Sequence, residues 1–289
     1  MSIIELKDVS FVYGKKSPYE IHALDNVCLS IEQGSITGII GHTGSGKSTL
    51  IQMLNGLIRP DSGTILINGN DIWEKPKQIS KIRYIVGMVM QYPEYQLFAD
   101  TVFDDIAYGP RNMGISGDEL DKRVLESLDF CGLGKDILDK SPFDLSGGQK
   151  RRVALAGVMA MDPEILVLDE PAAGLDPRGR REILGGISEY QKKSGKTVII
   201  VSHSMEDMAM YCDDIVVMSH GKLLMQGSSE TVFSKRDMLR EAGLDVPEIT
   251  NTAYALINQG IDIPNSIYTV NGAFDAIKEY ISRGGKNGI

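Results

Sequence analysis

The chain contains a glycine-rich stretch that ends in a lysine and two hydroxyl residues and lies between two apolar runs. It comprises Gly41, His42, Thr43, Gly44, Ser45, Gly46, Lys47, Ser48 and Thr49, after residues 36–40 and before residues 50–54. Glycines permit close backbone approaches, so successive N–H groups at a helix start can point at phosphate oxygens. Because a strand-like run precedes the stretch and a helix-like run follows it, the pattern fits a P-loop. We expect it to bind a nucleoside triphosphate.

The last three residues of this stretch have separate expected roles. Lys47 is predicted to reach the β- and γ-phosphates, Ser48 the Mg²⁺, and Thr49 the α-phosphate. The simpler alternative is a glycine-rich turn that contains Lys-Ser by chance. The strand-like and helix-like flanks favour the phosphate site.

Two carboxylates follow another apolar run. Asp169 and Glu170 come directly after residues 165–168, which are unbroken apolar as in a strand buried on both faces. The carboxyl edge of a parallel sheet is where a nucleotide site lies in such an architecture. We expect Asp169 to hold Mg²⁺, directly or through water, and Glu170 to accept a proton from the attacking water or to orient it. Two surface acids in a turn are the alternative interpretation.

A third stretch lies between these two. Leu145 is followed by Ser146, Gly147, Gly148 and Gln149 at the start of a helix-like run. Alone, this pattern could be a simple N-cap with a flexible entry. The order of P-loop, Leu-Ser-Gly-Gly-Gln, Leu-Val-Leu-Asp-Glu-Pro and a later isolated histidine resembles an ABC-type ATPase, over nearly all of residues 1–228.

The resemblance implies roles for four more residues. Tyr13 matches the aromatic residue that stacks on adenine, although a tyrosine in the core of an edge strand is the alternative. Gln91 matches the glutamine that touches Mg²⁺ and the attacking water and senses a transmembrane partner. Asp176 lies in the segment that crosses the dimer interface, and His203 matches the histidine that contacts the γ-phosphate.

The resemblance also implies that two such domains pack head to tail. ATP held by residues 44–49 of one subunit is then closed by Ser146, Gly147, Gly148 and Gln149 of the other. The helix after Ser146 presents free N–H groups and a positive dipole end to the γ-phosphate. ATP and Mg²⁺ are therefore the expected ligands, and one isolated subunit has no complete catalytic site.

Two further stretches narrow the family. Residues 92–98, 101–102 and 106–110, together with residues 242–247, resemble energy-coupling factor (ECF) transporter ATPases and their cobalt and nickel relatives. The form after Gln91 is more like the second of the two paired ECF ATPases. The resemblance implies a second ATPase subunit, a transmembrane coupling protein that docks near residues 91–110, and a membrane protein that captures a vitamin or metal ion.

Several alternatives stay open at this level. Residues 92–98 could be a surface loop without a docking role, and the C-terminal appendage could be a passive cap rather than a second ATPase contact. The native pair could be two different chains or a homodimer. A conventional importer or efflux ATPase would share every catalytic motif. A chromosome-maintenance ABC protein is disfavoured, because about 100 residues between Lys47 and Ser146 leave no room for a long coiled coil.

Composition restricts the partners. The net charge of −9 argues against a sequence-independent nucleic-acid binder, so no nucleic-acid partner is expected. Cys28, Cys131 and Cys212 lie far apart, which suits a reducing cytosol and argues against a zinc or disulfide framework. No signal peptide is evident, and no apolar run approaches the roughly 20 residues that span a bilayer. We expect a peripheral protein at the cytoplasmic face of the cell membrane.

The elements that must position these residues follow from patterning. The alternation of strand-like and helix-like segments predicts an α/β fold. The resemblance implies that this fold has a P-loop NTPase (RecA-like) core and an antiparallel β subdomain. It comprises an ATP-binding domain at 1–228, with a helical insertion at about 99–162 between two halves of a sheet, and a small α-rich C-terminal domain at 229–289. Residues 2–12 are predicted as an edge strand and 82–90 as a further strand.

The insertion and the C-terminal domain are predicted to be built from helices. Residues 101–107, 118–130 and 146–161 read as the helices of the insertion. Ser116 or Asp118 is expected to cap the second of them, and Asn271 to cap a C-terminal helix at 273–281.

Overall fold

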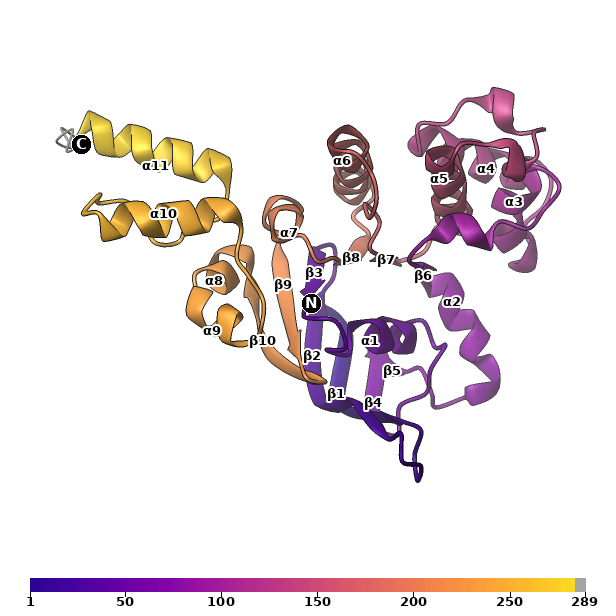
Figure 1. Cartoon of the computed structure of the whole chain (residues 1–289). Helices are drawn as coiled ribbons and strands as arrows, with labels where there is room; N and C mark the ends of the chain where they lie inside the picture. The colour runs from indigo at the N-terminus through magenta and orange to yellow at the C-terminus, as the bar shows by residue number, and fades with distance from the viewer. Residues whose placement is uncertain (284–289) are drawn as a thin grey trace.

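Two sheets organise the computed structural model, which describes residues 1–283 (Figure 1). The last six residues of the predicted C-terminal domain, 284–289, lie outside the described part. The first sheet has the order β2-β1-β4-β5 and the second the order β10-β9-β3-β8-β7-β6. Their strands are β1 Ser2–Tyr13, β2 Ile21–Glu32, β3 Ile36–Ile40, β4 Ser62–Ile67, β5 Asn70–Asp71, β6 Val86–Val89, β7 Ile165–Asp169, β8 Thr197–Val201, β9 Asp214–Ser219 and β10 Lys222–Ser228.

The antiparallel sheet corrects one expectation. Strand β1 is not an edge strand, because it pairs with β2 on one side and β4 on the other. Ile4, for example, faces Ile31 on β2 and Ile67 on β4. Apolar alternation reports which face of a strand is buried, but it does not report how many neighbours the strand has.

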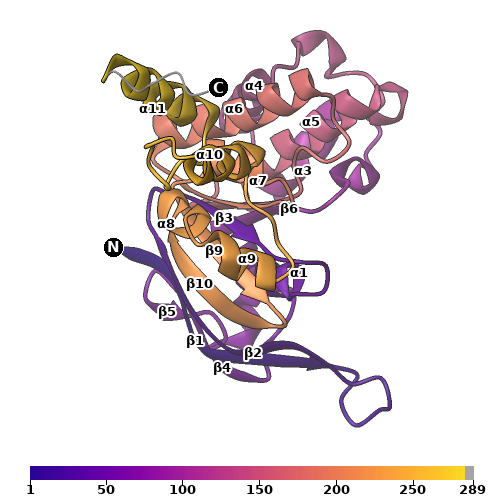
Figure 2. The same ribbon diagram turned by 60° about the vertical axis from the view of Figure 1, so that its left-hand side comes forward.

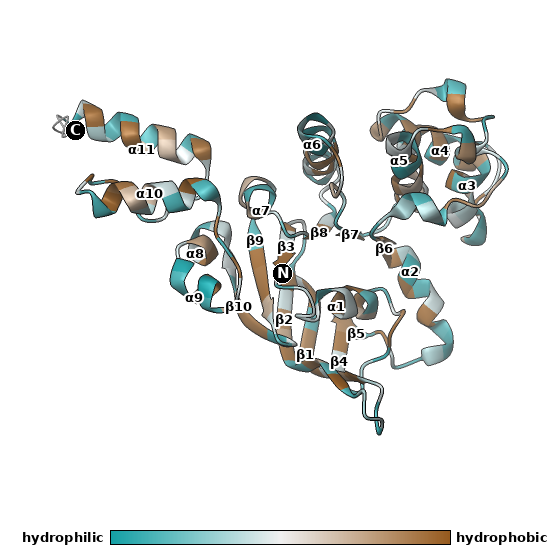
Figure 3. Ribbon diagram, in the orientation of Figure 1, coloured by the Kyte–Doolittle hydropathy of each residue, from teal (hydrophilic) through white to brown (hydrophobic). Residues whose placement is uncertain are grey.

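The six-stranded sheet carries the ends from which the site is built. Strands β3, β8, β7 and β6 are parallel, with β9 also parallel to β3 and β10 antiparallel to β9. Strands β3 and β8 are buried along their whole length, as expected for a sheet that is covered on both faces. One face packs against the antiparallel sheet and α1 (Lys47–Leu54), and the other packs against helices. Figure 3 shows the apolar residues concentrated on the strands.

The stretch predicted as a single strand at 82–90 divides into two elements. After the 3₁₀ turn Pro76–Lys81, it begins as the short helix α2 (Ile82–Ile85) and continues as β6. Only residues 86–89 reach a strand partner, β7. Ile82 and Ile85 instead pack on the core shared with the antiparallel sheet. A short apolar run cannot by itself distinguish a buried helix turn from a strand.

The helical insertion leaves the sheet after its edge strand β6 and returns as the neighbouring strand β7, so it does not separate two halves of the sheet. Its elements are the 3₁₀ turn η2 (Pro93–Gln96), α3 (Val102–Asn112), α4 (Asp118–Phe130), the 3₁₀ turns Lys135–Ile137 and Pro142–Asp144, and α5 (Gly147–Met159). The expected cap of α4 is wrong: Gly117, with φ of 62°, holds the N-cap position without a side-chain hydrogen bond. Glycine adopts this backbone conformation without steric strain.

The remaining helices follow the parallel strands. They are α6 (Pro177–Ser194), α7 (Met205–Tyr211), α8 (Ser229–Phe233), α9 (Arg236–Glu241), α10 (Glu248–Asn258) and α11 (Val270–Ser282). Helix α11 is capped by the Thr269 side chain, which accepts a hydrogen bond from Gly272 N, and not by Asn271. Helices α10 and α11 lie side by side, on the opposite side of the molecule from α3–α5 (Figures 1 and 2).

The C-terminal segment packs in two ways. Phe233, Leu239 and Val246 belong to the main core, whereas Ala253 and Ala273 belong to a small separate cluster formed by α10, α11 and the loop between them. The boundary at residue 229 stays a prediction. None of the described helices is both long and apolar enough to cross a bilayer.

Phe233 provides a test of this packing. It is fully buried, whereas Phe274 on α11 is 64% exposed. We expect Phe233→Ala to lower the free energy of unfolding by about 3–5 kcal/mol, because it removes a ring from a filled core. The matched change Phe274→Ala should stay within about 0.5 kcal/mol. Urea unfolding followed by circular dichroism measures both, and equal effects would contradict the packing of α8 into the main core.

Candidate functional site

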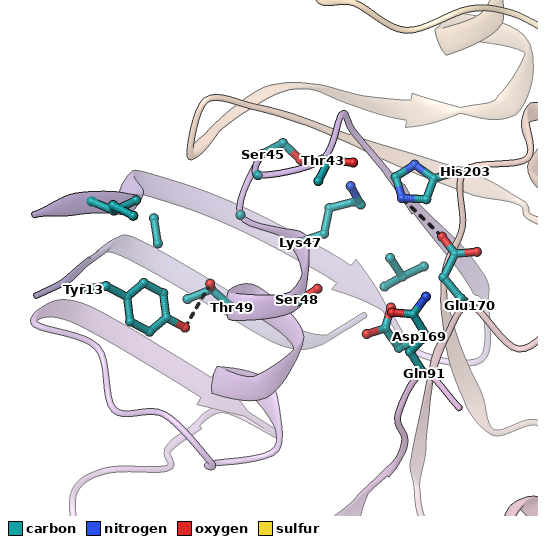
Figure 4. Close-up of a pocket in the computed structure, with 15 residues that line it drawn as sticks. Tyr13, Thr43, Ser45, Lys47, Ser48, Thr49, Gln91, Asp169, Glu170 and His203 are labelled. Atoms are coloured by element: carbon teal, nitrogen blue, oxygen red, sulfur yellow. Dashed lines mark hydrogen bonds and ion pairs between the residues drawn. The ribbon is translucent and has the colours of Figure 1, made fainter. Parts of the chain in front are cut away.

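A cavity of about 420 Å³ is lined by most of the site residues that were predicted from the sequence (Figure 4). It lies where β1, the loop before α1 and the carboxyl ends of β6, β7 and β8 meet. Its lining comprises Tyr13, Ile21, Ala23, Thr43, Gly44, Ser45, Gly46, Lys47, Ser48, Thr49, Gln91, Asp169, Glu170, Val201 and His203. Residues separated by up to 190 positions in the sequence, from Tyr13 to His203, therefore share one cavity.

The glycine-rich loop has the geometry of an anion cradle. Gly46 has φ of 102°, and a Cβ there would lie 2.5 Å from the carbonyl oxygen of Ala23. Helix α1 begins at the next residue, so its first N–H groups face the cavity end of the loop. The buried Lys47 ammonium donates hydrogen bonds to the carbonyl oxygens of Gly41 and His42. It is thereby held across the loop.

Gly41 and His42 do not line the cavity. A Cβ on Gly41 would meet Ser45 Oγ at 2.4 Å and the carbonyl oxygen of Met218 at 2.5 Å, so this glycine is needed for close packing beneath the loop. The His42 ring lies 4.6 Å from the ring of His220 and accepts a hydrogen bond from His220 N. Direct nucleotide contacts for Gly41 and His42 stay predictions.

The acidic end of the cavity is formed by the turn after β7. Glu170 has φ of 51°, and its N–H donates to the carbonyl oxygen of Val201 on β8. This bond ties the carboxylate to the strand that leads to His203. Glu170 Oε1 lies 3.5 Å from His203 Nε2 and has no hydrogen-bond partner among the described residues. A buried carboxylate oxygen without a hydrogen bond is unfavourable, which is typical of an atom that awaits a ligand.

Burial disfavours the charged forms in this cavity. It raises the pKa of Asp169, although the Lys47 ammonium opposes this, and it raises the pKa of Glu170, with the neighbouring Asp169 adding to the effect. Burial lowers the pKa of Lys47, with both carboxylates opposing the change. Burial and Lys47 also lower the pKa of His203, which favours a neutral imidazole. Such displaced values are typical of sites that bind or transform a charged substrate.

The other end of the cavity is aromatic and apolar. Tyr13 is partly exposed, and its hydroxyl lies 3.3 Å from Thr49 Oγ1, within hydrogen-bond distance. Ile21 faces Tyr13 across the β1–β2 pairing, and Ala23 lies further along β2. Ile21, Ala23 and Val201 were not among the predicted site residues, because no local motif marks them. Only the hairpin register could have indicated Ile21.

The predicted signature residues lie elsewhere. Ser146, Gly147, Gly148, Gln149 and Asp176 are absent from the lining of this cavity. Ser146 and Gln149 form a reciprocal capping box at the start of α5. The amides of Gly147 and Gly148 have no acceptor within the part of the chain that the structure describes. Asp176 caps α6 by accepting a hydrogen bond from Gly179 N.

Comparison with known proteins decides the family. A model described as ABC transporter matches residues 24–173. A relative from Caldanaerobacter subterraneus subsp. tengcongensis, named energy-coupling factor transporter ATP-binding protein EcfA2, is 51% identical over 284 residues, which cover 98% of this chain and 99% of the relative. The chain belongs to the ECF family of ABC transporter ATPases. This ECF ATPase is therefore an ATP hydrolase, as its motifs predict.

Solved structures confirm the α/β fold of the ECF ATPase. It resembles cbiO1 from Clostridium perfringens, described as part of the ABC transporter complex cbiONQ, with a TM-score of 0.74 and 39% identity over 88% of this chain and 99% of that chain. It also resembles the ATP-binding cassette MJ0796 in a dimeric post-hydrolysis state bound to ADP and Pi. The TM-score is 0.71 and the identity 30%, over 78% of this chain and 98% of that chain.

The donor set of the ECF ATPase suits a magnesium ion that is held together with a substrate. The cavity offers a hydroxyl from Ser48, an amide from Gln91 and a carboxylate from Asp169. Among residues 1–283 there is no cluster of three or more histidine, cysteine, aspartate or glutamate side chains that could bind a metal alone. Mg²⁺ is usually bound in this way, by one or two carboxylates together with substrate phosphates and water.

The buried Glu170 carboxylate should destabilise the nucleotide-free ECF ATPase. Because folding raises its pKa, the charged form is favoured in the unfolded chain, and the resulting loss of stability grows as the pH rises through the folded-state pKa. We expect Glu170→Gln to raise the free energy of unfolding at pH 7.5 by about 0.5–2 kcal/mol. The gain should shrink toward pH 5. Chemical denaturation at both pH values measures it.

Glu182 provides the matched control. Hydrogen bonds from Arg178 and Arg152 lower the pKa of this exposed carboxylate, so its charged form is favoured by folding. Glu182→Gln should therefore lower the stability at pH 7.5 or leave it unchanged. A stabilising effect of both substitutions, or a gain for Glu170→Gln that does not depend on pH, would contradict the assignment of the destabilisation to the Glu170 charge.

Proposed function

We propose that this chain is the ATP-hydrolysing subunit of an ECF-type importer for vitamins or transition-metal ions. It would act at the cytoplasmic face of the membrane together with transmembrane chains. The observation that carries the proposal is the cavity that brings Lys47, Asp169, Glu170 and His203 together in a chain that belongs to the ECF family. The relative cbiO1 is described as part of a transporter complex, which supports an assembly with membrane subunits.

We propose that the catalytic site is completed by a second ATPase subunit packed head to tail. In one chain the cavity lacks the signature segment, while the exposed Gly147 and Gly148 leave their amides without acceptors among residues 1–283. A helix N-terminus with free N–H groups binds phosphate oxygens favourably. The signature of one subunit would thus close over the γ-phosphate that the other subunit holds. The dimeric relative bound to ADP and Pi supports such pairing.

Within the closed site, each residue of this chain has a proposed task. The P-loop amides and Lys47 would hold the phosphates, and Tyr13 would stack on the adenine. Glu170 would accept a proton from the attacking water or orient it, with His203 beside it to contact the γ-phosphate. Ser48, Gln91 and Asp169 would hold Mg²⁺. When bound, that ion neutralises the charge that develops on the phosphate oxygens.

A second surface supports coupling to a membrane protein. A largely apolar cavity of about 390 Å³ lies between η2, α3 and α5, and its lining includes Leu97, Phe98, Tyr108 and Met161. The rings of Phe98 and Tyr108 are exposed and form an edge-to-face pair 4.9 Å apart. Exposed apolar grooves of this kind are typical of protein interaction sites. We propose that cytoplasmic helices of the coupling protein dock here, close to Gln91.

The hydrolytic role of Glu170 can be tested in the assembled complex. Glu170→Gln keeps the shape of the side chain but removes its ability to accept a proton. We expect the rate of ATP hydrolysis to fall by at least about 100-fold, while ATP still binds and holds the two ATPase subunits together. Phosphate release and size-exclusion chromatography with ATP measure the two effects. Hydrolysis at the full rate would show that another group activates the water.

The assignment to an ECF importer has its own test. We expect affinity purification from detergent-solubilised native membranes to recover a second, different ATPase, one coupling protein and several small substrate-binding membrane proteins. Mass spectrometry identifies these partners. Recovery of a homodimer with one dedicated permease would instead indicate a metal-type or conventional importer and would leave the ATPase mechanism intact.

A further inference from the structure

Arg151 connects three separate segments of the chain through one buried side chain. It lies in the second turn of α5 and is 8% exposed. Its Nε and Nη2 atoms each lie 3.3 Å from a different carboxylate oxygen of Glu94, so the two side chains form a bidentate ion pair. Its third nitrogen, Nη1, donates to the carbonyl oxygen of Ala173. All three nitrogens of the guanidinium are therefore used.

Arg151 and its two partners each lie three residues after a residue of the proposed site. Arg151 follows the signature residue Gly148, Glu94 follows Gln91, and Ala173 follows Glu170, in each case by three positions. Ala173 N also donates to the carbonyl oxygen of Glu170, which closes the turn that carries the carboxylate. The guanidinium thus fixes the far end of this turn relative to both other segments.

The ion pair between Arg151 and Glu94 restricts how the segments that carry these residues can move. The side chain of Glu94 is 18% exposed and that of Arg151 is 9% exposed, so water screens the pair weakly. A planar guanidinium that binds a carboxylate with two nitrogens restricts orientation as well as distance. Removal of one partner leaves a buried charge without compensation. The segments can therefore move relative to one another only with loss of these bonds.

Neighbouring residues do not duplicate the connection. Arg152, the next residue on α5, points to a different place and donates to the carbonyl oxygen of Cys131 and to Glu182. Glu170 itself is held by β8 through Val201, but the end of its turn at Ala173 has Arg151 as its side-chain partner. Within residues 1–283, Arg151 is the one side chain that joins η2, α5 and the turn after β7 by hydrogen bonds.

We propose that Arg151 is a positioning residue for hydrolysis, which holds the Glu170 turn in register with the segment after Gln91 and with the signature helix. The proposal rests on the proposed function of Glu170 and of the coupling surface. A shift of η2, when a membrane partner docks beside it, is transmitted through Glu94 and Arg151 to the carbonyl of Ala173 and hence to the catalytic turn. The same guanidinium links this turn to the signature that faces the second subunit.

The test uses the assembled transporter complex with Arg151→Lys, Arg151→Met and Glu94→Gln. Lysine keeps the charge but is a compact ammonium that cannot reproduce the two-pronged pairing together with the carbonyl bond. We expect kcat for ATP hydrolysis to fall about tenfold for Arg151→Met and less for Arg151→Lys, with KM for ATP within about twofold, because a misplaced group slows chemistry more than binding. The double variant with Glu94→Gln should be no slower than Arg151→Met, since both changes break one linkage.

A control variant and a normalisation distinguish a loss of positioning from a loss of folded protein. Arg123→Met removes an arginine that pairs with Glu119 on the surface of α4, in the same insertion but away from the cavity, and should leave kcat unchanged. Each kcat is divided by the nucleotide sites titrated in the same sample, so loss of folded protein does not lower it. If Arg151→Met does not fold, Arg151→Lys and Glu94→Gln still give the answer.

The outcomes are distinct. A wild-type complex that does not hydrolyse ATP would overturn the proposed function. Full activity of Glu170→Gln would overturn the hydrolytic role of Glu170, and with it the positioning role that rests on it. Normal wild-type activity with unchanged kcat in Arg151→Lys and Glu94→Gln would overturn the positioning role alone. Additive losses in the double variant, or a rise in KM without a fall in kcat, would also overturn it, because the two residues would then act separately or through binding.

Discussion

The burial of opposite charges at one end of a parallel sheet is the constraint on which the rest of the structure depends. Lys47 is the first residue of α1, Asp169 ends β7 and Glu170 follows it, and burial disfavours the charged form of each of the three. The three groups compensate one another only in part, because one ammonium faces two carboxylates. A magnesium ion held together with a triphosphate would supply the missing positive charge. This cluster of partly compensated buried charges is expected to lower the stability of the fold, a common property of active sites.

The sheet is the element that makes this arrangement possible. Strands β3, β8 and β7 are adjacent and parallel, so their carboxyl ends deliver the P-loop, the segment before His203 and the two acids to one edge. Helix α1 adds the positive end of its dipole at the same place. The strands are buried on both faces, which leaves little freedom for the loops at their ends to move apart.

The helical insertion carries the signature residues, which do not line the cavity of their own chain. Its helix α5 carries the signature at one end, and its 3₁₀ turn η2 adjoins the apolar groove. The insertion is joined to the sheet through β6 and β7 and through the side chain of Arg151. Contacts on the outside of the molecule are thereby connected to the carboxylate turn by a short path of hydrogen bonds.

The sequence alone determined the chemistry and the class of fold, because the glycine-rich loop, the acids after an apolar strand and the signature are local patterns. It also predicted α4 to the residue and the strands around the P-loop, since long periodic or fully apolar runs have few alternatives.

The tertiary structure decided the features that depend on contacts between residues far apart in the sequence. The interior place of β1, the helical start of the 82–90 stretch and Ile21 in the cavity each depend on pairing or packing with distant residues. The triple contact of Arg151 is of the same kind. No spacing in the chain reveals that Glu94, Arg151 and Ala173 meet, because only the folded sheet and insertion bring them together.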